Sequence, residues 1–153
     1  MVEEPSASAP DDSDRIVVRT GPDSIAFLRG AQWVDSLPNL VQARLIESFE
    51  NAHLIRSVAR PSDSVAADYK LITSVRRFDI TAGSGEAVVQ ISAKLADDHS
   101  GRVLAGKIFT GQALGSAGQG ASATHALDEA LAQVMKQIVA WSAERMRTSH
   151  PAS

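Results

Sequence analysis

Apolar and polar residues alternate along EAVVQISAKLADD (86–98), as expected for a β-strand that buries one face. Val89, Ile91, Ala93 and Leu95 fall on one face, and Val88, Gln90, Ser92 and Lys94 fall on the other. Strand-like segments precede and follow it, DYKLITSVRRFDI (68–80) and GRVLAGKIFTG (101–111). The connecting segments TAGSG (81–85) and DDHSG (97–101) carry the Gly, Ser and Asp typical of hairpin turns. The pattern therefore predicts an antiparallel meander with one buried face and one mostly solvated face.

Two segments have helical period, because their apolar residues recur every three and four positions. The first begins at Leu37, with Ser36 as its N-cap and Pro38 in its first turn, and it ends near Asn51. The second runs to about Arg147 and has the stronger pattern. Its stripe comprises Ala123, Ala126, Leu127, Ala130, Leu131, Val134, Ile138, Trp141 and Arg145. Each helix therefore has one apolar face to bury.

The remaining elements complete a two-layer α+β fold. IVV (16–18) and IAFLRG (25–30) predict a hairpin, and LIRSVA (54–59) predicts another strand before a loop. Strands and helices with one apolar face each bury these faces against one another when two helices pack on a single face of a mainly antiparallel sheet.

Three segments follow from the composition along the chain. Residues 1–14 are acidic and rich in Ser, Pro and Ala, which predicts a disordered lead or linker. We expect residues 15–147 to form a single domain and residues 148–153 to form a disordered tail.

Composition limits the function classes. A net charge of −3 argues against a nucleic-acid binder, which carries a basic stripe. Because there is no Cys, thiol catalysis, disulfides and thiolate metal sites are excluded. No apolar run approaches the roughly 20 residues that span a bilayer, and no secretory signal pattern is present. Cytosol and periplasm both stay open.

Candidate chemistry is sparse, and no catalytic, cofactor or metal residue is predicted. The histidines lack ligand spacing, and His99 beside Asp97 and Asp98 is typical of a solvated hairpin turn. The Gly-rich loop at 113–122 follows a strand and precedes a helix but has no P-loop Gly-Lys-Ser/Thr. Ser116 in this loop lacks the G-x-S-x-G frame of a hydrolase.

Three residues are candidate partner contacts. Strict alternation places Arg76 and Arg77 on opposite faces of a strand, so that one of them must emerge at an edge or pair with a carboxylate such as Asp79. The ordinary interpretation is a rim salt bridge of little energetic weight. Trp33 lies in a polar connector, where it is either a lid on the core or an interface anchor.

Four stretches together resemble the ABC-type transport auxiliary lipoprotein family, which includes the Pqi-type lipoproteins encoded beside MCE-domain proteins. They are RIVVRTGPDSIAFLRGAQWVDSLPNLVQARLIESFENA (15–52), DYKLITSVRRFDI (68–80), AVVQISAKLADDHSGRVLAGKIFTG (87–111) and ALDEALAQVMKQIVAW (126–141). The resemblance spans nearly the whole predicted domain. It lies in the order of elements, without an invariant catalytic motif.

The resemblance implies a non-enzymatic periplasmic lipoprotein, anchored to the outer membrane by an N-terminal lipidated Cys. Its expected partners are an MCE-domain protein and ABC transporter components that move lipids or other hydrophobic substrates, and a homo-oligomer stays open. This chain has no signal peptide and no lipobox Cys. Either it begins after them, which suits a tether at residues 1–14, or this member is not lipidated.

Two alternatives remain beside this docking module. A soluble carrier would hold a lipid in an apolar cavity between helices and sheet. A hydrolase would use Ser116 or His99 in a concave pocket.

Overall fold

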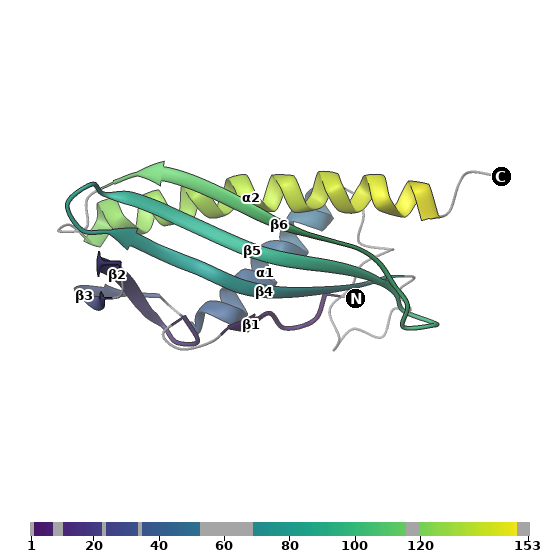
Figure 1. Cartoon of the computed structure of the whole chain (residues 1–153), viewed down its shortest axis with the longest axis horizontal. Coiled ribbons are helices and arrows are strands. Elements are labelled where there is room, and N and C mark those ends of the chain that lie inside the picture. Colours follow the sequence, from purple (N-terminus) through teal and green to yellow (C-terminus); the bar gives the residue numbers. More distant parts are fainter. Residues whose placement is uncertain are drawn as a thin grey trace.

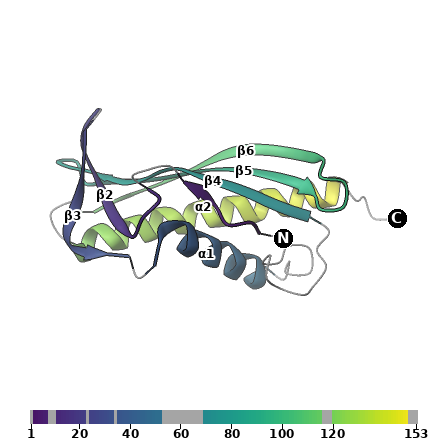
Figure 2. The ribbon, with the colours of Figure 1, turned by 90° about the horizontal axis from the view of Figure 1, so that it is seen from below.

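The computed structural model describes residues 2–7, 11–22, 24–33, 35–52, 69–115 and 120–149. Six strands and two helices follow in the order β1 (Ser6–Ala7), β2 (Arg15–Gly21), β3 (Ser24–Gln32), α1 (Leu37–Asn51), β4 (Tyr69–Thr81), β5 (Glu86–Asp97), β6 (Val103–Leu114) and α2 (Gly120–Ser149). Figure 1 shows the strands as one layer with the helices behind it, and Figure 2 shows both helices on the same face. The predicted α+β fold is confirmed.

The sheet is mixed but mostly antiparallel, with the strand order β3-β2-β4-β5-β6. The predicted hairpin β2–β3 and the meander β4–β5–β6 are both present as antiparallel pairs. Positive φ angles at Gly83, Gly85 and Gly101 allow the two tight meander turns, as the Gly-containing turn segments predict. The segments at 54–59 and 60–67 lie outside the described residues.

The expected disorder of residues 1–14 is wrong for the part of this segment that the structure describes. Val2 is fully buried and bridges to Leu71, and β1 pairs in parallel with β4. The Gln42 amide of α1 donates to the Val2 carbonyl at 3.0 Å, and Lys70 pairs with Glu3 at 2.9 Å. The segment is ordered because it completes one edge of β4, next to β2 (Figure 1).

A β-bulge in β4 changes the predicted positions of the two arginines. Val75 is paired with Ile91 and Arg77 with Gln90, so Arg76 is the extra residue. Phe78 thereby returns to the core face, while Arg76 is exposed and Arg77 lies on the outer face. The prediction of one arginine on each face is wrong, because the bulge interrupts the two-residue period.

The core fills the space between the sheet and the helices. Val89, Ile91 and Leu95 of β5 are fully buried, as predicted. Trp141 of α2 is 8% exposed and packs edge-on against Phe109 at 5.4 Å between ring centroids. The helix α2 is longer than predicted at both ends, so residues 148 and 149 are helical, and residues 150–153 lie outside the description. Arg145 is exposed and does not join the buried stripe.

The helix α1 begins at the predicted residue but is capped differently. Ser36 occupies the N-cap position with extended backbone, and its side chain makes no capping hydrogen bond. Instead, the Leu37 N–H donates to the Ser13 carbonyl at 2.8 Å. The segment that was expected to be disordered thus satisfies the first free N–H of the helix.

Candidate functional site

A pocket lies beside Trp33, where the end of β3 meets both helices. Its volume is about 280 Å³ and it is lined by Gln32, Trp33, Leu37, Leu40, Arg44, Phe78, Thr124, Asp128 and Leu131. The Trp33 ring is half-buried and meets Phe78 edge-on, with 5.7 Å between centroids and an interplanar angle of 87°. Sites that enclose a small molecule usually measure about 300–1,000 Å³. This pocket is therefore slightly smaller than an ordinary ligand site.

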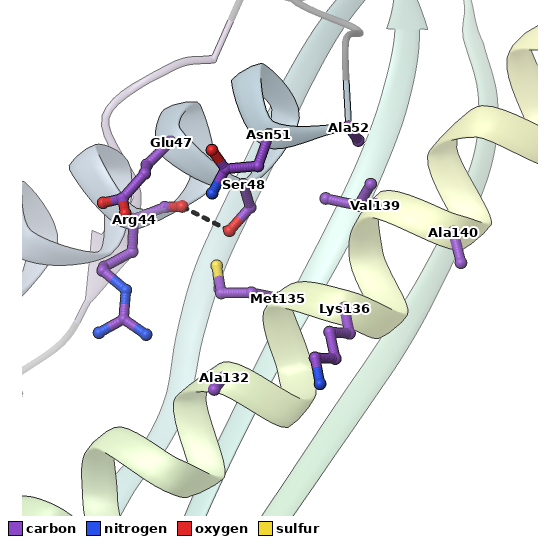
Figure 3. A pocket seen from close by; sticks show the side chains of 10 residues that line it. All are labelled: Arg44, Glu47, Ser48, Asn51, Ala52, Ala132, Met135, Lys136, Val139 and Ala140. Atoms are coloured by element: carbon purple, nitrogen blue, oxygen red, sulfur yellow. Dashed lines mark hydrogen bonds between the residues drawn. The ribbon is translucent and has the colours of Figure 1, made fainter.

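A second hollow separates the later turns of the two helices. It has a volume of about 470 Å³, and Figure 3 shows the side chains that line it, from Arg44, Glu47 and Asn51 of α1 to Met135, Lys136 and Val139 of α2. An ion pair between Arg44 and Asp128 joins the helices, and both residues also line the pocket beside Trp33. Charged side chains stand at the rim of this groove, so it is not the closed apolar cavity that the carrier alternative requires.

A cluster of four charged residues lies on the outer face of the sheet. The Asp79 side chain is 3% exposed; its Oδ1 accepts from Arg77 at 2.9 Å, and its Oδ2 lies 3.5 Å from Arg19. Asp11 adds a second carboxylate, and burial, followed by repulsion from Asp79, raises its pKa to about 6. The two cations oppose that rise. Arg77 thus pairs with the carboxylate that the sequence suggested.

The three predicted partner contacts do not share one surface. Trp33 contacts Phe78 on the helix side of the sheet, whereas Arg77 lies on the opposite face with Gln90. Arg76 is exposed at the bulge, and no ion pair among the described residues involves it. A single partner surface could include the two arginines without Trp33.

No assembled catalytic or metal site is found in the described part of the chain. His99 is exposed in the β5–β6 turn, where its backbone N–H donates to the Asp97 carboxylate at 2.8 Å. No group of three or more His, Asp or Glu residues there could hold a metal ion. Ser116, the nucleophile that the hydrolase alternative names, lies outside the residues that the structure describes. None of the described helices combines the length and apolarity that crossing a membrane requires.

Sequence reasoning missed Asp11 and the polar contacts of β6 with α2. Asp11 stands in an acidic segment whose composition is typical of a solvated linker. Its burial follows from the pairing of β1 and β2 with β4, which the sequence does not indicate. The amide of Gln133 accepts from the Gln112 N–H at 3.0 Å and donates to its carbonyl at 2.8 Å. Gln133 and Gln137 at a spacing of four residues were the available signal for contacts along one helix side.

Comparison with known proteins gives one family and a consistent fold. Residues 1–139 match the model of the ABC-type transport auxiliary lipoprotein component family. A crystal structure of a Xanthomonas campestris protein has a TM-score of 0.89 at 30% identity, covering 99% of this chain and 87% of that one.

Two further comparisons are more limited. An uncharacterized protein of Bradyrhizobium diazoefficiens is 39% identical over 112 residues, or 72% of this chain, but the match spans only 30% of that protein's length. The PelC dodecamer from Paraburkholderia phytofirmans has a TM-score of 0.53 at 16% identity, covering 90% of this chain and 83% of that one. This last likeness concerns the fold alone.

Proposed function

The chain belongs to the ABC-type transport auxiliary lipoprotein component family, and from this premise we propose that it is a non-enzymatic docking component that binds an MCE-domain protein. The transport system it serves would move lipids or other hydrophobic substrates. The observation that carries the proposal is the extent of the family match, since residues 1–139 include every strand, α1 and most of α2.

We also propose a location in the periplasm, with attachment to the outer membrane through an N-terminal lipid. The family description as a lipoprotein component supports this proposal. The dodecamer described for PelC comes from a protein only 16% identical, so the number of copies in an assembly of this chain is left to measurement.

Arg76 is the first residue to test as a partner contact. It is exposed on the bulge of β4, beside the charged cluster around Asp79, so a partner can reach it without unfolding the sheet. We include Trp33 and Arg77 as further contacts, on the helix side and the outer face respectively.

The experiment is co-purification of this chain with the MCE-domain protein encoded nearest to its gene, both expressed in one host. We expect a stable complex that Arg76→Glu weakens and that Arg145→Glu, the same change at an exposed position on α2, leaves intact. Recovery of the chain without the MCE-domain protein, in gentle detergent and at low salt, would refute the proposed docking.

The carrier alternative would have to use the groove of about 470 Å³ between α1 and α2, whose rim carries charged side chains. A carrier purified from cells would retain lipid, which mass spectrometry of an organic extract detects. Lipid-free protein that still binds the MCE-domain protein would leave docking as the function.

A further inference from the structure

The strand β6 forms one edge of the sheet, and α2 covers only part of that edge. Gln133 of α2 bonds both backbone groups of Gln112, and the Gln137 amide donates to the Thr110 carbonyl at 3.1 Å. These backbone groups therefore point away from β5. Every second residue of a strand points its N–H and C=O to the same side, so those of Ile108 and Gly106 also face outward.

The covering by α2 stops at Thr110. Four residues after Gln137, the next position along the helix is Trp141, whose ring turns into the core against Phe109. Within the described part of the chain, no hydrogen bond reaches the outward N–H or C=O of Gly106 or Ile108. Among the described residues, the edge from Val103 to Ile108 is thus open, whereas α2 closes the edge from Thr110 to Gln112.

The open half of the edge is apolar and basic. Val103 is 54% exposed and Ile108 is 49% exposed. Lys94 and Lys107 are exposed, and neither takes part in an ion pair among the described residues. A β-carbon at Gly106 would lie 3.6 Å from the Lys94 Cγ, so the Lys94 stem lies beside this glycine, next to the open edge.

We propose that the open half of β6, from Val103 to Ile108, binds an extended acidic segment of a partner protein by strand addition. Unpaired N–H and C=O groups in a row select a β-strand, because a strand offers complementary groups at the same spacing. Ile108 would lie beside an apolar side chain of the added strand. Lys94 and Lys107 would pair with carboxylates, one on each face of the extended sheet.

A second copy of this chain is a poorer occupant. An antiparallel pair of β6 strands that exchanges bonds between Gly106 and Ile108 places the two Lys107 residues directly opposite each other. Like charges in that position destabilise the pair, and lysines on an edge are a common protection against self-pairing. The charge on the edge therefore favours an acidic partner.

This inference rests on the proposed function for the identity of the partner, the MCE-domain protein, but the edge can be tested separately. The readout is amide hydrogen exchange of Gly106 and Ile108, measured by NMR on the isotope-labelled chain. Two probes are added in turn: the MCE-domain protein, and an eight-residue peptide of alternating Val and Glu. A peptide of alternating Val and Lys serves as the control.

We expect both amides to exchange fast in the free protein and to be protected by the partner and by the acidic peptide, but not by the basic one. Lys107→Glu should weaken binding about five- to tenfold, whereas Lys136→Glu, the same change on α2, should not. Ile108→Pro removes an outward N–H that β5 does not use and should also weaken binding.

The outcomes separate the two proposals. Binding of the MCE-domain protein without protection of these amides overturns the edge proposal and leaves the docking function standing. Protection by the acidic peptide but not by the MCE-domain protein supports strand addition at β6 and rejects the MCE-domain protein as the partner at this edge. If neither probe protects the amides, or if they are already protected in a self-associated form, the edge proposal is wrong.

Discussion

Gly111 of β6 lies directly against the Ala130 carbonyl of α2, so closely that no β-carbon fits between them. A β-carbon there would also lie 3.1 Å from the Val134 Cγ2 atom. We expect Gly111→Ala to push α2 away from the sheet and to lower the free energy of unfolding by about 1–3 kcal/mol, as overpacking does. Urea denaturation followed by circular dichroism measures the change.

Gly106→Ala is the matched control, because it makes the same substitution five residues earlier on the same strand. Its β-carbon would meet only ordinary contacts at 3.6 Å. We expect unchanged or slightly higher stability, since Ala restricts the unfolded chain more than Gly does. Equal losses from the two variants would contradict close packing of α2 at Gly111.

Val2 is fully buried against the sheet although it stands near the start of the chain. Val2→Ala removes two methyl groups from this contact and should lower the free energy of unfolding by about 1–2.5 kcal/mol. The control is Val103→Ala, at a valine that is 54% exposed, where a change within about 0.5 kcal/mol is expected. Unchanged stability for Val2→Ala would mean that the N-terminal segment does not pack as described.

The sequence predicted the helices and the meander because apolar residues recur at a helical or a strand-like spacing over most of each element. It could not predict the order of residues 2–7, where Val2 is the only large apolar residue. That segment is held by backbone pairing with the edge of β4, for which composition gives no signal. Composition indicates how much apolar surface a segment can bury by itself. It does not indicate whether a strand distant in the sequence offers a free edge for backbone pairing.

The candidate contacts show a similar limit. The prediction for Arg76 and Arg77 assumes that side chains alternate strictly between the two faces of the strand. The extra residue of the bulge places every later side chain of β4 on the face opposite to the one that this alternation predicts. The pairing of Arg77 with Asp79 could be anticipated, because residues two apart on a strand share a face. The contribution of Asp11 could not, because it depends on where β2 enters the sheet.

Gln133 closes the edge of β6 at Gln112 with two hydrogen bonds. Gln133→Ala removes both and should cost about 1–2 kcal/mol of stability, because the Gln112 N–H loses its protein partner. The amide of Gln112 should also exchange faster with solvent. Glu129→Ala, at an exposed position one turn earlier on α2, should change neither quantity. An unchanged exchange rate in Gln133→Ala would refute the edge covering.

Asp11 predicts how stability depends on pH. Burial, with repulsion from Asp79, raises its pKa from 3.8 to about 6, while Arg19 and Arg77 oppose the rise. The folded protein therefore holds this proton more tightly than the unfolded chain does. The stabilisation by the protonated form is complete below about pH 4 and is lost as the pH rises through about 6.

Asp11→Asn isolates this effect, because Asn keeps the size of the side chain and cannot ionise. Relative to the wild type, the variant should gain about 1–3 kcal/mol of stability between pH 4 and pH 8, with most of the gain between pH 4 and 6.5. Urea denaturation of both proteins across this range measures the difference. Asp12→Asn, at the exposed neighbouring residue, should follow the wild-type curve. A difference between wild type and Asp11→Asn that is constant with pH would show that Asp11 ionises equally easily in the folded and unfolded chain.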